Sequence, residues 1–588
     1  MRTPHFATLE RLEDRIAPAG LVTVDFSNGV LTIDGSDGAN HEVHLVKTGV
    51  NKFRVEGVAT GINSLDNTSE TFRGELKHVL IEGGAGNDQF EVTKLAPLKS
   101  FSFNGNAGTD SLTTSGFKIR ADGSVNIAMG SETGTVDFGG GKTLIMGSLT
   151  MDLGGGATVG FGSAKTLIVG NAVFEGGVAS DSVSFTGQKT TLKHSLTFHG
   201  AGGDDNFSST GNTLKVKGNV VMTGDGETDH FVFDSQRMTF GKELAPRVID
   251  INLGAGIGSV EFRGASTEVF GSVRIDLGTG GGTASLVSTE TTIQKNVQVT
   301  GGAGNDNVEI DGRTKIKKGF SFIGDTGDDV FTVDGGLFAV KGSTSMNGGS
   351  GAEANVFDLN VVQLKLAGLS FSGGSSNDSV SIIADGVIGG NASFELGADG
   401  TGPSSVVLQS RAGIVNGLLF DGSLDINMTG ATVDVLTIAN IQVTDAFTAQ
   451  TGENVSTVNI SNLNGRGSFT LNTGAGADVV NLDNINAGVL AIDTGVGADE
   501  LRIERNAAYA GISNVRGNAV ILTGIGADQI RIGNSIDSAN LLVAFGGGMT
   551  LDAGDGANMR NDIVASNTFV VTPTIVASGG TLTETPAV

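Results

Sequence analysis

The sequence predicts an all-β protein, a parallel β-helix with coils of about 22–25 residues. The main observation is a glycine-rich turn that recurs at a nearly fixed spacing. In the clearest stretch the turns open at Gly301, Gly324, Gly348, Gly373 and Gly397, so the spacings are 23, 24, 25 and 24 residues. A repeat of this length is typical of a solenoid, in which each repeat packs against its neighbours.

Short strands with alternating apolar residues fill the space between the turns. In the coil that opens at Gly301, Val308 and Ile310 fall on one face of a strand and Glu309 on the other. Glycine and asparagine at the corners allow the positive φ angles that tight bends require. Because parallel crossovers are right-handed in nearly all proteins, we expect a right-handed β-helix.

The composition agrees with a packed repeat array. The 588 residues include 93 glycines, but proline is scarce and there is no Gly-X-Y triplet, which excludes collagen. There is no cysteine, which excludes disulfides and thiolate metal sites. Many phenylalanines recur at equivalent strand positions and are expected to stack in the interior. The examples are Phe320, Phe322, Phe331, Phe357 and Phe371.

The charge of the chain restricts its partners. The formal net charge of −26 argues against nucleic acid and against an anionic membrane surface, since both attract basic patches. It favours divalent cations as partners. No run of 18 or more apolar residues occurs, so we expect no membrane-spanning helix.

The pattern along the chain suggests five segments. Residues 1–20 lack the apolar stretch of a secretory signal peptide. Residues 21–82 are rich in strands but off the repeat, as expected of a cap that covers the open end of a solenoid. Residues 83–400 carry the clearest glycine turns, residues 401–565 continue the helix with weaker turns and then GxGAD turns, and residues 566–588 form a loose tail.

The N-terminal segment contains the string LERLEDR at residues 9–15. This string resembles the LExLEDR motif near the N-terminus of large exported and surface proteins of planctomycetes. The resemblance implies secretion or display on a bacterial cell surface. The alternative is an unrelated charged, amphipathic helix.

The glycine turns also carry aspartates at a fixed offset. Residues 83–91 and residues 301–309 match the pattern G-G-x-G-x-D-x-U-x, in which U is a large apolar residue. This pattern resembles the nonapeptide of the RTX, or haemolysin-type, calcium-binding proteins. The resemblance implies that Asp88 and Asp306 are Ca²⁺ ligands. Partial matches place five further aspartates at the same position: Asp110, Asp205, Asp229, Asp329 and Asp378.

The match to the RTX pattern has clear departures. That family repeats its nonapeptide in tandem, whereas here one turn occurs in each 22–25 residues. Asp306 and Asp329 would stack about 5 Å apart, where their repulsion is roughly 1 kcal/mol in water and about 3 kcal/mol at an effective dielectric constant of 20. Neutralisation by Ca²⁺ would relieve a ladder of such pairs. The alternative is that each aspartate caps its turn by accepting backbone N–H groups, without metal.

The sequence favours a non-catalytic, extracellular or cell-surface structural or adhesive protein that binds Ca²⁺ weakly. Cell-surface glycans or other surface proteins are the expected partners. The carboxylate pairs follow from the turn repeat, the histidines form no motif, and neither a nucleophile elbow nor a P-loop is present. The alternative is a β-helix lyase or hydrolase acting on acidic polysaccharide. Gly224 and Gly254 are 30 residues apart, and the surplus residues 236–247 are expected to form a loop outside the coil. A groove beside this loop that holds converging Asp and Arg or Lys side chains would favour this enzyme.

Overall fold

The computed structural model describes most of the chain between residues 20 and 585. The described residues are 20–35, 37–94, 97–116, 118–349, 354–374, 377–396, 403–411, 413–430, 432–504, 506, 511–533, 541–555, 560–564, 568–569, 574–578 and 581–585. Among them the secondary structure is strand without helix, as predicted. Consequently, this part of the chain contains no helix that is long and apolar enough to cross a membrane.

The chain divides into two compact units, residues 1–218 and residues 219–588. Both units are built from stacked coils with parallel strand pairing. The segment that contains LERLEDR lies outside the described residues, and so do much of the C-terminal tail and Tyr509.

Unit 1 begins with antiparallel strands and then changes to parallel coils. β1 and β2 form a hairpin whose turn residues Asn28 and Gly29 have φ angles of 52° and 82°. This two-residue turn with two positive φ angles is the type that an Asn-Gly pair favours. β3, β4 and β6 pair antiparallel, whereas β2 and β3 pair in parallel with β7 and β8. The bounds are β1 (Leu21–Ser27), β2 (Val30–Asp34), β3 (Glu42–Gly49), β4 (Lys52–Gly57), β6 (Ser69–Arg73), β7 (His78–Ala85) and β8 (Gln89–Thr93).

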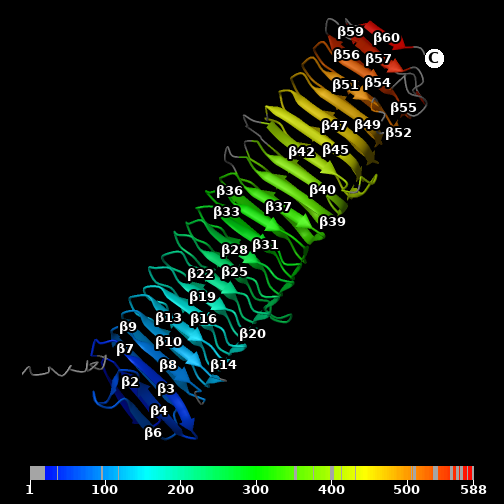
Figure 1. Ribbon diagram of the computed structural model, residues 1–588. Helices are drawn as coiled ribbons and strands as arrows, with labels where there is room; N and C mark the ends of the chain where they lie inside the picture. The colour runs from blue at the N-terminus through cyan, green and yellow to red at the C-terminus, as the bar shows by residue number, and fades with distance from the viewer. Residues whose placement is uncertain are drawn as a thin grey trace, which may run out of the picture. The chain divides into compact units, whose positions relative to one another are not determined.

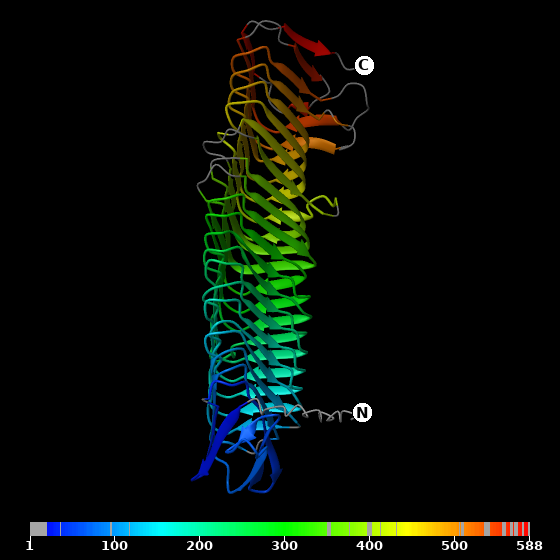
Figure 2. The same ribbon diagram turned by 60° about the vertical axis from the view of Figure 1, so that its left-hand side comes forward.

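Each regular coil of unit 1 contains three strands. A strand pairs with the strand three places further along the chain, so equivalent strands of successive coils form three parallel sheets. Figure 1 shows the strands of one such sheet side by side with their arrows in the same direction, and Figure 2 shows the turns of successive coils in line. Representative strands are β13 (Gly134–Phe138), β16 (Ala157–Phe161), β17 (Lys165–Ile168), β18 (Ala172–Glu175) and β19 (Ser182–Phe185).

Unit 2 repeats this arrangement and then modifies it. From β38 (Leu337–Asn347) onward, some strands that are separate in the earlier coils join across a bend, which gives strands of 9–17 residues. The strands between residues 403 and 450, where the glycine turns are indistinct, therefore still belong to the stack. The strands used below are β24 (Val220–Thr223), β26 (Arg237–Phe240), β27 (Ile249–Asn252), β30 (Val273–Asp276), β33 (Val297–Gly302), β39 (Val356–Ser372), β42 (Pro403–Gln409), β45 (Val433–Val443), β47 (Ser456–Gly465), β49 (Val479–Ala487), β51 (Glu500–Ile503) and β52 (Gly511–Val515).

Phenylalanine stacks occupy the core of both units, as predicted. In unit 2, Phe331, Phe357 and Phe371 stack in sequence with ring centroids 5.4 and 5.7 Å apart. In unit 1, Phe161 lies between Phe138 and Phe185 at 4.7 and 4.5 Å, with the rings within 10° of parallel. Because the coils are in register, equivalent side chains pack directly on one another, and this burial stabilises the stack.

The loop near position 240 is shorter than the sequence predicts. Residues 236–247 were expected to form a loop outside the coil. However, Arg237–Phe240 is β26, which pairs in parallel with the equivalent strand of the next coil. Met238 and Phe240 in this strand are buried, so they belong to the core. Only the residues after β26, where Leu244 is 98% exposed, extend from the coil.

Candidate functional site

The aspartates of the glycine turns form a buried ladder within each unit. All seven predicted metal ligands lie where a strand begins, on the inner side of a turn, and each is no more than 1% exposed. Asp110 is the first residue of its strand, and the other six immediately precede theirs. They are Asp88, Asp110 and Asp205 in unit 1 and Asp229, Asp306, Asp329 and Asp378 in unit 2. The structure thus brings them together in columns, as the repeat predicts.

A ladder carboxylate such as that of Asp306 accepts a backbone N–H from the preceding coil. The N–H of Asp306 donates to Oδ1 of Asp329 at 2.9 Å, and Oδ1 of Asp306 accepts from Gly282 at 2.8 Å. Oδ2 of Asp306 accepts the N–H of Gly302 in its own turn at 2.9 Å. The carboxylate therefore joins two coils and caps its own corner, which satisfies backbone groups that would otherwise be buried without a partner.

The first glycine of each turn provides the space for the carboxylate. A Cβ added to Gly301 would overlap with Oδ2 of Asp306, and one added to Gly224 would overlap with Oδ2 of Asp229. At Gly83 the same added carbon would lie 2.8 Å from Oδ2 of Asp88, closer than real Cβ atoms approach. These opening glycines do not have positive φ angles, so conformational freedom does not explain them. The five-residue offset between glycine and aspartate is therefore a packing requirement.

Asn355 occupies the ladder position between Asp329 and Asp378. Its Oδ1 accepts the N–H of Asp329 at 3.3 Å, and its Nδ2 donates to the carbonyl oxygen of Gly373 at 2.7 Å. A neutral amide thus performs the acceptor role of the aspartates and adds a donor. A negative charge is not required at this position.

The arrangement of the carboxylates does not fit a calcium cage. Ca²⁺ takes 6–8 oxygen ligands at 2.3–2.6 Å. In the ladder, Oδ1 is occupied by an N–H of the preceding coil and Oδ2 lies against a glycine backbone. Within the described residues, no group of three or more His, Cys, Asp or Glu side chains is placed to hold a metal ion. Calcium binding by the seven aspartates stays a prediction, whereas the turn-capping alternative accounts for their contacts.

His41 terminates the ladder of unit 1 at its N-terminal side. Its backbone N–H and its ring Nδ1 both lie within hydrogen-bonding distance of Oδ1 of Asp88, at 2.8 and 2.7 Å, and its Nε2 lies 2.8 Å from Asp37. Burial by itself lowers the pKa of His41, but the hydrogen bonds to Asp88 and Asp37 and their negative charges raise it overall. The imidazolium is the form that can donate to both carboxylates at once.

Burial shifts the ladder carboxylates in the same direction. Desolvation raises the pKa of Asp110 to about 7, and the nearby charge of Asp88 adds to this increase. Desolvation also raises the pKa of Asp306, Asp434 and Asp499 to about 6, against the opposing effect of their backbone hydrogen bonds. Near neutral pH these groups therefore bind protons that they would release in the unfolded chain.

These shifts predict that the protein is more stable at pH 5 than at pH 8. A carboxyl group with a raised pKa in the folded state binds more protons there than when unfolded, so stability falls as pH rises between about 4 and 7. The raised pKa of His41 acts in the same sense, because its contribution is lost as pH rises through the folded-state pKa. The shifts of the Asp306 and Asp110 carboxyl groups correspond to roughly 3 and 4 kcal/mol across the window. Thermal melting between pH 4.5 and 8.5 measures the slope.

Asp110→Asn provides the control for this pH dependence. The amide keeps the acceptor for the N–H of Asp88, as Asn355 does for Asp329, but it does not titrate. We expect this variant to fold and to show a shallower slope than the parent chain. General repulsion among surface carboxylates also grows with pH. An unchanged slope in Asp110→Asn would assign the pH dependence to the surface and contradict the role of the buried group.

The ladder has several members beyond the seven predicted aspartates. Asp181 and Asp434 occupy it without the full glycine pattern, and Asp478, Asp499 and Asp528 continue it in the GxGAD turns. Their spacing provided a signal, because Asp181 lies 24 residues before Asp205. His41 gave no such signal, since it precedes Asp88 by 47 residues.

A shallow hollow of about 210 Å³ lies on the outer face of β24, β27 and β30, and its lining includes Asp250, Arg274 and Asp276. Asp250 and Arg274 are direct partners across neighbouring strands. Asp250 and Asp276 are both at least partly exposed, so the two carboxylates have similar surroundings. A catalytic acid and base are instead usually distinguished by different environments.

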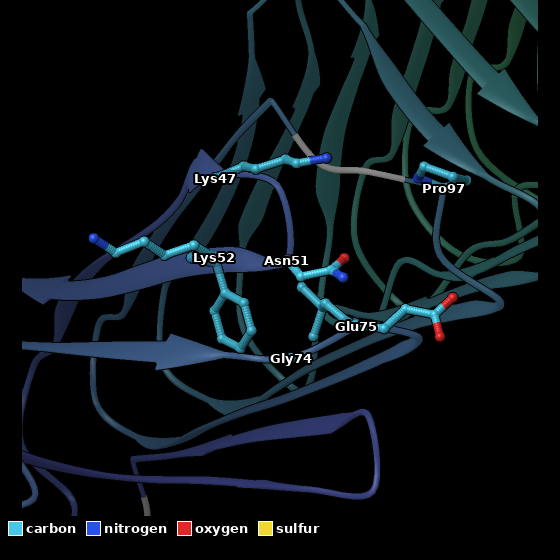
Figure 3. A pocket seen from close by; sticks show the side chains of 8 residues that line it. Lys47, Asn51, Lys52, Gly74, Glu75 and Pro97 are labelled. Carbon is cyan, nitrogen blue, oxygen red and sulfur yellow. The ribbon is translucent and has the colours of Figure 1, made fainter.

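A smaller cavity of about 190 Å³ lies in the cap of unit 1. Lys47, Asn51 and Glu75 extend to one side of it and Lys52 to the other, as Figure 3 shows. Phe53 and Leu76 complete the lining and are buried in the cap. Phe53 also packs against Phe26 and Phe72, so this gap borders the hydrophobic core of the cap.

Comparison with known proteins adds no family assignment. No protein-family model matches the sequence, and a search of curated proteins finds no match.

Proposed function

We propose that the chain is a non-catalytic structural and adhesive protein, exported to the cell surface or the extracellular matrix. The observation that carries this proposal is the ladder. The aspartate that recurs in the glycine turns is used inside the wall of the solenoid, where it joins one coil to the next. The repeated residues thus stabilise the scaffold, and recognition of a partner would involve the outer face.

One property of the sequence supports display outside the cell: the string at residues 9–15 resembles a motif of exported planctomycete proteins. The net charge of −26 keeps such a protein soluble and favours contact with cations. Adhesion to glycans or to other surface proteins is the activity that we assign to the scaffold.

A polysaccharide-active enzyme is the second candidate. The hollow on the outer face of β24, β27 and β30 favours it, because Asp250, Asp276 and Arg274 line it together, as such a site would require. Fold alone is a weak argument for catalysis, because the same scaffold can carry unrelated functions.

The experiment compares the location and the activities of the full chain. Antibody labelling of the source cells before and after permeabilisation is expected to give the same signal, because the protein is displayed outside. Purified protein is expected to bind cell-wall material and to release no reducing ends from polysaccharides. Label that appears only after permeabilisation would contradict the proposal. Release of reducing ends that is lost in Asp250→Asn or Asp276→Asn would establish the enzyme.

The same preparation tests calcium. If the aspartates act as hydrogen-bond acceptors, the melting temperature in excess EDTA should equal that in millimolar Ca²⁺ within about 1 °C, since a ligand stabilises only the state that binds it. A rise of several degrees in Ca²⁺ that disappears in Asp306→Asn would instead establish the calcium sites implied by the RTX-like pattern. Asp234→Asn, a change outside the ladder, serves as the control.

A further inference from the structure

A polar groove of about 670 Å³ crosses five successive coils of unit 2. It lies on the outer face of β42, β45, β47, β49 and β51, which pair in parallel and in register. These strands lie side by side in Figure 1. Because coils stack about 4.8 Å apart, each type of lining side chain recurs at that interval along the groove.

The groove follows a bend in the strands. Asn440, Asn462 and Asn484 have φ angles of 60°, 52° and 53°, a conformation that asparagine tolerates better than most residues. Their side chains form a ladder, with Nδ2 of each donating to Oδ1 of the preceding one at 2.8 and 2.7 Å. The bend is thus fixed in three consecutive coils and gives the groove a rigid shape.

The floor of the groove consists of the residues just before the bend. They are Ala439, Ser461 and Asp483, which lie in register and are 5–9% exposed. Ala439 and Ser461 are small, so the floor is open to a ligand rather than filled by side chains. Asp483 lies at one end, where its Oδ1 accepts the N–H of Asn506 at 3.0 Å.

One wall presents a column of hydrogen-bonding side chains. Thr437, Asn459, Asn481 and Arg502 are direct partners in successive strands. Nδ2 of Asn481 donates to Oδ1 of Asn459 at 2.9 Å, and Nη1 of Arg502 donates to Oδ1 of Asn481 at 3.3 Å. These bonds orient the amides but leave further donor and acceptor capacity on each of them.

The charges around the groove are nearly balanced, in contrast to the net charge of the chain. Arg502 forms an ion pair with Glu500, and Arg531 also contacts Glu500 at 3.2 Å. Asp483 supplies one negative charge at the floor. Desolvation raises the pKa of the neighbouring buried Glu504 to about 7, so this group is largely protonated below neutral pH.

We propose that this groove binds a neutral, linear polysaccharide whose chain lies across the successive coils. The inference rests on the proposed adhesive function and specifies the ligand. Amide, hydroxyl and guanidinium groups that recur at the coil interval suit a polymer whose hydroxyl groups recur along its length. Asp483 disfavours acidic polysaccharides, and the −26 charge of the chain disfavours nucleic acid.

The test is isothermal titration of the full chain with soluble linear glucan and mannan, with polygalacturonate as the acidic comparison. The double variant Asn459→Ala/Asn481→Ala removes two recognition groups and is expected to weaken binding of the neutral polymer about tenfold or more. Ser461→Gln fills the floor while leaving both amides in place, and it should weaken binding without removing an inter-coil hydrogen bond. Gln298→Ala and Asn126→Ala, on exposed strand positions outside the groove, should bind within about twofold of the parent chain.

The possible results separate this inference from the proposed function. Unchanged binding in both groove variants would place the glycan elsewhere and overturn the groove assignment, although surface display would stand. Equal or tighter binding of polygalacturonate would overturn the assignment of a neutral ligand. No binding of any glycan, together with labelling of intact cells, would also overturn the groove assignment alone. Release of reducing ends that Asp483→Asn abolishes would support glycan binding here and contradict the non-catalytic role.

Discussion

Gly224→Ala is expected to destabilise unit 2 by about 3 kcal/mol or more. The added methyl group would overlap with Oδ2 of Asp229 and approach the carbonyl oxygen of Leu253 to 2.9 Å. Neither group can retreat, because the carboxylate is buried and the carbonyl belongs to the next coil. The change should appear as a lower denaturant midpoint and as faster amide exchange in β24 and β27.

The same turn contains the control. Gly226 has open space around its Cα and does not have a positive φ angle, so Gly226→Ala should be close to neutral. A double-mutant cycle then identifies the clash. In an Asp229→Ala background Gly224→Ala should cost clearly less, because the carboxylate that it displaces is gone. Additive costs would show that the glycine is needed for a reason unrelated to the carboxylate.

Phe161→Ala is expected to destabilise unit 1 by about 3–5 kcal/mol. Phe161 is fully buried and contacts a stacked ring on each side, so its removal leaves a cavity between two coils. The neighbouring rings belong to strands held in register by parallel hydrogen bonds, and they cannot close the gap by moving along the stack. Phe161→Leu retains most of the volume and should cost about 1 kcal/mol.

Local measurement is needed for this prediction because coils contact only their neighbours. Amide exchange should accelerate most in β13, β16 and β19, with smaller effects in the cap strands β3 and β4. A loss of protection that is uniform across residues 20–218 would indicate that unit 1 unfolds as a single cooperative body. Protection that is unchanged in β16 would contradict the role of the stack.

The fold was predictable because its signals are local. Glycine-rich turns at Gly301, Gly324 and Gly348 set the period, and alternation at Val308 and Ile310 set the inward face. The interior phenylalanine stacks follow directly from these two facts. β26 has the same alternation of apolar residues, but its charged neighbours led to the wrong prediction that it is part of a loop.

The chemistry of the turns was less predictable because it depends on contacts between coils. The offset between Gly301 and Asp306 is the same for a calcium motif and for a carboxylate that packs on a glycine. Only the position of the neighbouring coil distinguishes the two, through the N–H of Gly282. Likewise, the recurrence of Asn440, Asn462 and Asn484 every 22 residues is visible in the sequence, but not that these residues bend three strands around a groove.

The ladder also gives the array a direction of growth. A ladder carboxylate accepts a backbone N–H from the coil before it, as Asp329 does for Asp306 and Asp499 does for Asp478. This N–H in the last coil of a stack therefore lacks its acceptor until the next coil is added. At the first rung of unit 1, His41 holds the place of the earlier residue, because both its backbone N–H and its ring Nδ1 lie within hydrogen-bonding distance of Oδ1 of Asp88. In a chain synthesised from its N-terminus, the N–H at this position of the newest coil therefore stays unpaired until the next coil folds. Deleting coils from the two ends therefore has different effects. A C-terminal truncation leaves a backbone N–H without its acceptor, whereas an N-terminal truncation leaves a carboxylate without its donor.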